Sequence, residues 1–235
     1  MYDESRYDVQ TENRANSLAA CLVSVYWWMT FALIVSGLTA YMVGTSEELA
    51  KIFVKNPGVF MVLAIIEIIM VIGITAGINK LSAATATALF ILYAAINGLT
   101  LSVIFLAYTL GSIAVTFAVT AGTFGVMALI GTVTKKDLTG MGNLLLMALL
   151  GLIIASIVNI FWANSTLYWI CTYAGVLIFV GLTAYDAQKI KKMYIEAGTD
   201  NPETTRKIAV LGALSLYLDF INLLLYLLRL FGRRR

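Results

Sequence analysis

The chain has 235 residues, of which 60% are hydrophobic and only 12% are charged, and its mean hydropathy is +0.89. This composition is typical of a single domain that crosses a membrane several times. The absence of histidine excludes a histidine-ligated metal site and a histidine proton relay, and the modest net charge of +3 gives no reason to expect binding to nucleic acid.

The first 18 residues are polar and mixed in charge. They lack the basic start, the short apolar core and the Ala-x-Ala site of a cleaved signal peptide. We therefore expect a polar cytoplasmic arm over residues 1–18, a transmembrane domain over residues 19–231 and a basic tail over residues 232–235.

Runs without any charged residue cover positions 15–46, 81–134 and 138–185. Because about 20 apolar residues span about 30 Å of hydrocarbon, the second and third runs must each fold back once. Hydropathy and loop signals predict seven helices, over residues 19–42, 59–78, 83–108, 113–134, 144–162, 167–185 and 208–230. The expected fold class is an all-α membrane protein, with short loops between antiparallel neighbours.

The lysines and arginines predict the orientation in the bilayer. Ten of them lie in the N-terminal arm and in the loops on its side, whereas the opposite loops hold two. The N-terminus is therefore expected in the cytoplasm of a multi-pass protein of the cell (inner) membrane. Seven crossings would place Arg229 and the arginines at 233–235 outside, so a last segment that enters and returns stays an alternative, although seven crossings are favoured.

The last predicted helix carries one aspartate, Asp219, in an otherwise apolar stretch. An ionisable side chain inside a membrane-length helix carries an insertion penalty of about 2.5 kcal/mol or more, so by default it faces a partner or water and marks a pathway. Ser215, Asn222 and Tyr226 share a helical stripe with Asp219, while leucines cover much of the rest. We expect the polar stripe to face an ion pathway and the leucine face to suit lipid.

Asp186, at the end of the sixth predicted helix, has two interpretations. It is either a surface residue balanced by the lysines that follow it, or a residue that approaches Asp219 across the last two helices. Two carboxylates at hydrogen-bonding distance in a low-dielectric site cannot both ionise cheaply, so the pair would hold one proton between them. Such a pair senses protons, and when fully ionised Asp186 and Asp219 would form a transient Ca²⁺ site, because Ca²⁺ prefers oxygen ligands.

Glu67 is the third candidate, in the second predicted helix, with no other charged residue before Lys80. Burial without a charged partner predicts that it is protonated, or that it is bonded to a polar group such as Asn97 or Asn159. A role in lining the ion pathway is favoured over a purely structural hydrogen bond.

Three segments together resemble one known family. They are ALSLYLDFINLLLYLLR at 213–229, GLTAYDAQKIK at 181–191 and KKDLTGMG at 135–142, of which the first is the specific signature. The chain resembles, over most of its length, the Bax inhibitor-1 (transmembrane Bax inhibitor motif) family in a bacterial form. The resemblance implies seven helices, with the last enclosed by the other six, and a pH-sensitive calcium leak. It further implies that Asp186 and Asp219 are the gating pair and that Glu67 is the glutamate of the pathway.

One position departs from the family pattern. Some bacterial members carry an arginine late in the second helix that bonds one aspartate of the pair. The matching position here is Ile78, with Lys80 two residues later. If Lys80 does not reach the pair, the closed state is held more weakly or in another way, which affects the pH of gating and not the fold.

The leading hypothesis is thus a passive Ca²⁺ leak controlled by H⁺, without a cofactor, in a monomer or weak oligomer. An intramembrane aspartyl protease is disfavoured: Tyr185 and Asp186 reproduce its Tyr-Asp pair, but Asp219 does not lie in Gly-x-Gly-Asp and no Pro-Ala-Leu segment follows. A retinal protein is disfavoured because the last helix has no interior lysine.

The second hypothesis is a membrane regulator that acts by binding a partner. The resemblance suggests, for some bacterial relatives, action through a membrane-bound quality-control protease. Two segments could dock such a partner: the N-terminal arm and the loop expected from Gln188 to Lys207. A solvated loop explains the charges of the second segment equally well.

Overall fold

The computed structural model describes residues 2–46, 48–49, 56–198 and 201–234. Its helices are α1 (Tyr2–Thr45), α3 (Pro57–Gly77), α4 (Ala83–Leu101), α5 (Val103–Ala107), α6 (Leu110–Val133), α7 (Thr139–Trp162), α8 (Ser165–Ala197) and α9 (Pro202–Phe231). Within the described residues, seven spans are long and apolar enough to cross a membrane, with α4 and α5 forming one of them. The predicted all-α membrane fold with seven crossings is confirmed.

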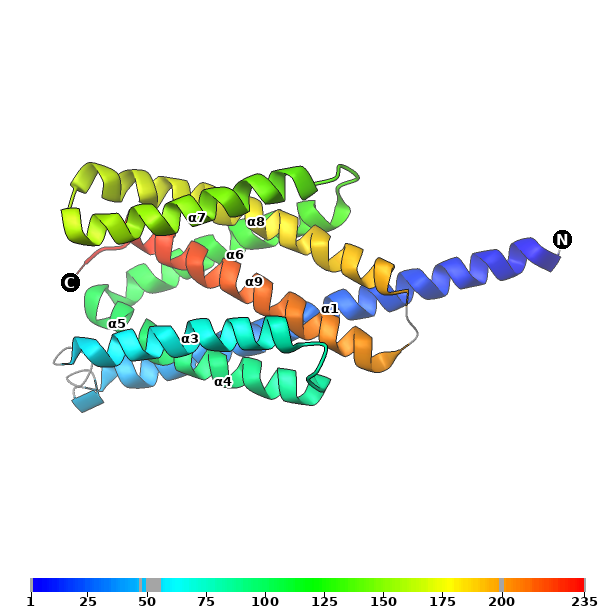
Figure 1. Cartoon of the computed structure of the whole chain (residues 1–235), viewed down its shortest axis with the longest axis horizontal. Helices are drawn as coiled ribbons and strands as arrows, with labels where there is room; N and C mark the ends of the chain where they lie inside the picture. Colours follow the sequence, from blue (N-terminus) through cyan, green and yellow to red (C-terminus); the bar gives the residue numbers. More distant parts are fainter. Residues whose placement is uncertain (1, 47, 50–55, 199–200, 235) are drawn as a thin grey trace.

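The helices run roughly along the long axis of the molecule, with the two chain termini at opposite ends (Figure 1). The connections α6–α7 and α8–α9 lie toward the same end as the N-terminus. Helix α9 is a single continuous helix of 30 residues. The alternative in which the last segment enters and returns is therefore wrong.

Helix α9 lies at the centre of the bundle, as expected. Most of its apolar segment is buried, whereas little of α3 or α7 is. In the described residues it packs mainly against α8, α1, α6 and α4. The leucine face does not suit lipid as predicted, because Leu223, Leu224 and Leu228 are all buried inside the protein.

The start of α9 follows from local chemistry. Asn201 precedes the helix, and its side-chain oxygen accepts a hydrogen bond from the Glu203 backbone N–H at 2.9 Å. Pro202 occupies the first turn, where its missing N–H does no harm. Glu203 in turn caps α4, because its carboxylate accepts a hydrogen bond from the Ala83 backbone N–H at 2.6 Å. These caps explain why α9 begins six residues before the predicted position.

Two predicted boundaries are wrong by more than three turns. Helix α1 begins at Tyr2, so the polar arm continues into the first membrane helix. Helix α8 runs to Ala197 and ends at Gly198, which has φ 57° in the left-handed region that favours glycine. Most of the loop expected from Gln188 to Lys207 is therefore helical.

Close glycine contacts bring α6 and α7 against α8. A Cβ on Gly131 of α6 would overlap the backbone of Ala184, and a Cβ on Gly142 of α7 would overlap the Tyr185 ring. Both contacts lie within two residues of Asp186. The glycines therefore fix the part of α8 that carries the candidate site.

Candidate ion site on the central helix

A cavity of 330 Å³ lies between α7, α8 and α9. Its α7 wall is apolar, whereas α9 supplies the polar stripe identified in the sequence and α8 supplies a carboxylate. The lining residues are Leu146, Leu149, Ile153, Phe179, Leu182, Asp186, Ser215, Leu218, Asp219, Asn222 and Tyr226. The structure thus brings Asp186, Asp219 and Asn222 to one cavity.

Asp219 is the most confined charge-bearing group of the site. The residue is only 4% exposed, and its Oδ2 has no hydrogen-bond partner among the described residues, Asp186 included. Asp186 is half-buried and close enough to repel an ionised Asp219. The two side chains therefore face one cavity without a hydrogen bond through Asp219 Oδ2.

Lys189 supplies the positive charge that acts on this pair of aspartates. It lies three residues after Asp186 on α8, and its charge acts on both carboxylates. Its ammonium group also lies 5.9 Å from the centre of the Tyr185 ring. Lys80 is exposed and Ile78 is buried in the hydrophobic core, so neither occupies the role of the second-helix arginine.

A clamp joins α8 to the connection between α6 and α7, just beyond Asp186. Buried Gln188 accepts a hydrogen bond from the Leu138 backbone N–H and donates one to the Lys136 carbonyl, both at 2.8 Å. Lys192 forms an ion pair with Asp137 at 2.5 Å, and this hydrogen bond holds the pKa of the Asp137 carboxyl well below its usual range. We call the contacts of Gln188 and Lys192 the loop clamp.

Glu67 lies outside the cavity, on α3, and is half-buried. Its two carboxylate oxygens accept hydrogen bonds from the Asn97 amide at 3.1 Å and the Thr100 hydroxyl at 2.8 Å, both on α4. The predicted partner Asn97 is thus present, whereas the alternative Asn159 instead accepts a hydrogen bond from the Asn164 backbone after α7. Glu67 and Asp219 are therefore separate polar sites.

Sequence reasoning missed two residues that extend the hydrogen bonds of the Glu67 site to the central helix and to α1, Tyr217 and Ser36. Tyr217 is fully buried on α9 and donates to the Asn97 side chain at 2.8 Å. Ser36 of α1 lies 2.6 Å from the Tyr217 hydroxyl. The available signal was weak, since a tyrosine or serine in an apolar helix is usually read as a packing residue.

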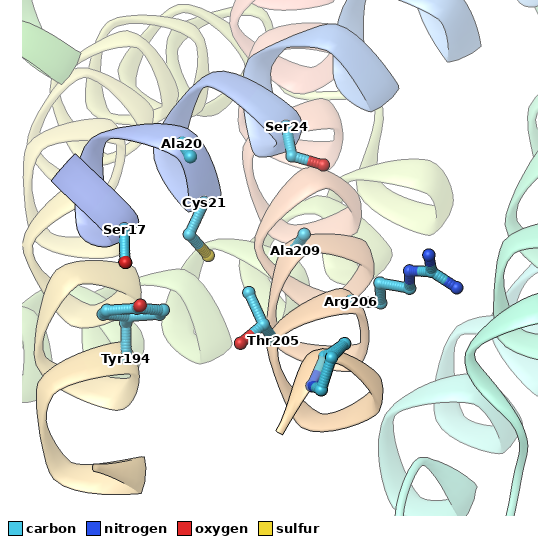
Figure 2. A pocket seen from close by; sticks show the side chains of 9 residues that line it. Ser17, Ala20, Cys21, Ser24, Tyr194, Thr205, Arg206 and Ala209 are labelled. Atoms are coloured by element: carbon cyan, nitrogen blue, oxygen red, sulfur yellow. The ribbon is translucent and has the colours of Figure 1, made fainter. Parts of the chain in front are cut away.

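A second cavity, of 420 Å³, lies between α1, α8 and α9 and is shown in Figure 2. Hydroxyl groups and the Cys21 thiol line it, and Arg206 turns its guanidinium away from Cys21. None of the lining residues carries a carboxylate. This cavity therefore lacks the chemistry that a divalent cation prefers.

The described residues contain no group of three or more histidine, cysteine, aspartate or glutamate side chains that could hold a metal ion. The Asp186 and Asp219 pair offers only two carboxylates, whereas Ca²⁺ takes six to eight oxygen ligands in stable sites. The transient Ca²⁺ contact at this pair therefore stays a prediction.

Seven membrane-length helices in the described part of the chain, with two carboxylates facing a cavity between α7, α8 and α9, define a multi-pass membrane protein. A family model described as "Inhibitor of apoptosis-promoting Bax1" matches residues 18–235. The chain belongs to this family, the Bax inhibitor-1 family, as its motifs indicated.

Relatives match along nearly the whole chain. The inner membrane protein YbhL of Escherichia coli strain K12 is 48% identical over 230 residues, 98% of each chain. An uncharacterized protein of Borreliella burgdorferi is 47% identical over 214 residues, 91% of this chain and 92% of that protein. The uncharacterized protein RP147 of Rickettsia prowazekii is 40% identical over 215 residues, 91% of this chain and 89% of that protein.

Proposed function

We propose that this protein is a pH-sensitive calcium leak of the cell (inner) membrane, with a cytoplasmic N-terminus. The observation that carries the proposal is the cavity into which Asp186 and Asp219 both project, with Asp219 almost fully buried. A buried carboxylate without an ion pair is expensive inside a membrane protein and marks a pathway for ions or protons. A second, half-buried carboxylate on the neighbouring helix, Asp186, adds a means of controlling the pathway by pH.

The protonation state of Asp186 and Asp219 shifts the balance between an arrangement in which α8 and α9 stay in contact at this cavity and one in which they separate. When both carboxyl groups are ionised, their like charges repel across a low-dielectric cavity and favour separation of the helices. A proton on either group removes that repulsion and favours the closed arrangement. A helix contact poised within a few kcal/mol of balance responds to such a change, so the leak should rise as pH rises.

The cation itself would pass Glu67, Asp219 and Asn222. Glu67 and Asp219 supply negative charge on opposite sides of the central helix, and Asn222 lines the same cavity as Asp219. Lys189 opposes cations at the pair, so the site attracts Ca²⁺ without holding it tightly. This balance suits a leak that runs down a gradient.

Calcium uptake by liposomes that contain the purified full-length protein tests the proposal. Influx should exceed that of protein-free liposomes, and it should increase from about pH 5 to about pH 8. Absence of influx at every pH, with folding verified by circular dichroism, would refute the leak.

A second candidate function, regulation through a partner, rests on the shape of α1. Its N-terminal part projects beyond the other helices, where a second protein could contact it (Figure 1). A membrane-bound quality-control protease is the proposed partner. Deleting residues 2–15 distinguishes the two functions, because a leak should survive the deletion and a docking function should not.

A further inference from the structure

A chain of hydrogen bonds crosses the bundle from α3 to α1 through the central helix. Glu67 accepts from the Asn97 amide, and the Asn97 oxygen accepts from the Tyr217 hydroxyl. The Tyr217 hydroxyl also lies 2.6 Å from Ser36, which in turn lies 2.7 Å from the Ala94 carbonyl. Four helices, α3, α4, α9 and α1, therefore meet through a few polar side chains.

The carboxylate of Glu67 sets the direction of this chain. An ionised carboxylate only accepts hydrogen bonds, so Asn97 must present its NH₂ group to Glu67 and its oxygen to Tyr217. Tyr217 has a single hydrogen, which it donates to Asn97, while the Ser36 hydroxyl lies within hydrogen-bonding distance of both Tyr217 and the Ala94 carbonyl. A change at Glu67 thus alters the hydrogen bond that Asn97 donates and, through Asn97, the one that Tyr217 donates.

Tyr217 cannot respond by turning its ring. The side chain is 0% exposed, and the edges of Phe90 and Tyr93 pack against it at centroid distances of 5.7 and 5.8 Å. Tyr217 also lies two residues before Asp219, so the two side chains leave α9 about 200° apart. A shift of Tyr217 therefore moves the helix segment that presents Asp219 to its cavity.

In the described part of the chain no lysine or arginine pairs with Glu67. The hydrogen bonds from Asn97 and Thr100 therefore offset the cost of burying its carboxylate. A Ca²⁺ ion at Glu67 would take oxygen atoms that now accept from those donors. Asn97 would then be freed from Glu67, and its hold on Tyr217 would weaken.

On the basis of the calcium pathway proposed above, we propose that Asn97 and Tyr217 are positioning residues that couple cation binding at Glu67 to the position of Asp219. Binding of an ion at Glu67 would thereby change the position of Asp219 relative to Asp186. Coupling of this kind is reciprocal, so the state of the pair also changes the affinity of Glu67 for the ion.

The calcium dependence of influx in a double-mutant cycle tests this coupling. Tyr217→Phe keeps the packed ring and removes only the hydroxyl. Asn97 is then held less firmly in place, so it competes less well with Ca²⁺ for the Glu67 carboxylate. The half-saturating Ca²⁺ concentration should fall by about threefold to tenfold, the equivalent of one hydrogen bond. In a Glu67→Gln background the same change should have no effect. Equal effects in both backgrounds would overturn the proposal.

Tyr93→Phe is the matched control: it removes a hydroxyl from the neighbouring ring that makes none of the hydrogen bonds of the chain, so it should change the half-saturating concentration less than Tyr217→Phe does. Thermal unfolding in detergent gives a readout independent of flux. Glu67→Gln and Tyr217→Phe should shift the unfolding temperature non-additively, although Asn97 separates the two side chains. Non-additive unfolding without any influx would refute the leak and keep the chain, whereas additive shifts would refute the chain.

Discussion

Replacing Gln188 by leucine should open the loop clamp beside Asp186. Gln188 is 6% exposed, and its side chain makes two hydrogen bonds of 2.8 Å to the backbone between α6 and α7. At about 1 kcal/mol net for each bond, the loss is about 2 kcal/mol. For a chain of this length, that corresponds to a fall of about 4–8 °C in unfolding temperature.

The ion pair of the clamp should contribute much less. The side chains of Lys192 and Asp137 are 39% and 69% exposed, so water screens their attraction. Gln188→Leu should therefore lower the unfolding temperature measured in detergent and raise the calcium leak at neutral pH, while Asp137→Asn should do little to either. An equal loss of stability in Asp137→Asn would refute this ranking of the two contacts.

Three further outcomes follow from the same structure. Gly131→Ala should destabilise the protein by about 3 kcal/mol in thermal unfolding, because the added methyl overlaps the Ala184 backbone, which cannot rotate away; an unchanged unfolding temperature would contradict that contact. Asp137→Asn should leave the pH midpoint of calcium influx unchanged. The lowered pKa keeps the Asp137 carboxyl ionised at and above the pKa of about 3.9 that it has in the unfolded chain, so its contribution to stability is lost only as pH falls through the pKa of the folded state. Glu67→Gln should reduce influx about tenfold at low Ca²⁺, since losing about 1.4 kcal/mol of attraction is a factor of ten; undiminished influx would remove Glu67 from the pathway.

The spacing of polar residues in the last helix was enough to predict the polar wall of the site. Ser215, Asp219, Asn222 and Tyr226 recur on one helical stripe, and all four line the cavity. Their surroundings were not predictable from that stripe. The leucines of the opposite face read as lipid-facing because hydropathy is the same for a leucine in lipid and a leucine in a protein core.

The length of α8 shows where hydropathy misleads. The charge-free run stops before Asp186, and a loop was predicted from Gln188, yet Ile190 is buried and Met193 packs against the core on the same helix. The exposed Lys189 and the half-buried Lys191 and Lys192 do not interrupt the helix, because lysine is a good helix former. The helix ends only at Gly198, where the left-handed conformation becomes necessary.

Hydrogen bonds between distant helices were the least predictable feature. Asn97 and Asn159 were equal candidates for Glu67 in the sequence, and only packing of α3 on α4 decided between them. The link from Asn97 to Tyr217 joins residues 120 positions apart, so no local pattern reveals it.

Calcium influx into liposomes from about pH 5 to about pH 8, measured for the wild type and for Asp219→Asn, tests the aspartate-pair sensor most directly. Asp137→Asn provides the matched control, because it makes the same chemical change in the exposed loop. We predict that influx through the wild type and the control rises with pH, and that Asp219→Asn changes or abolishes this dependence. The same pH profile and the same influx in all three proteins would contradict control of the leak by Asp186 and Asp219.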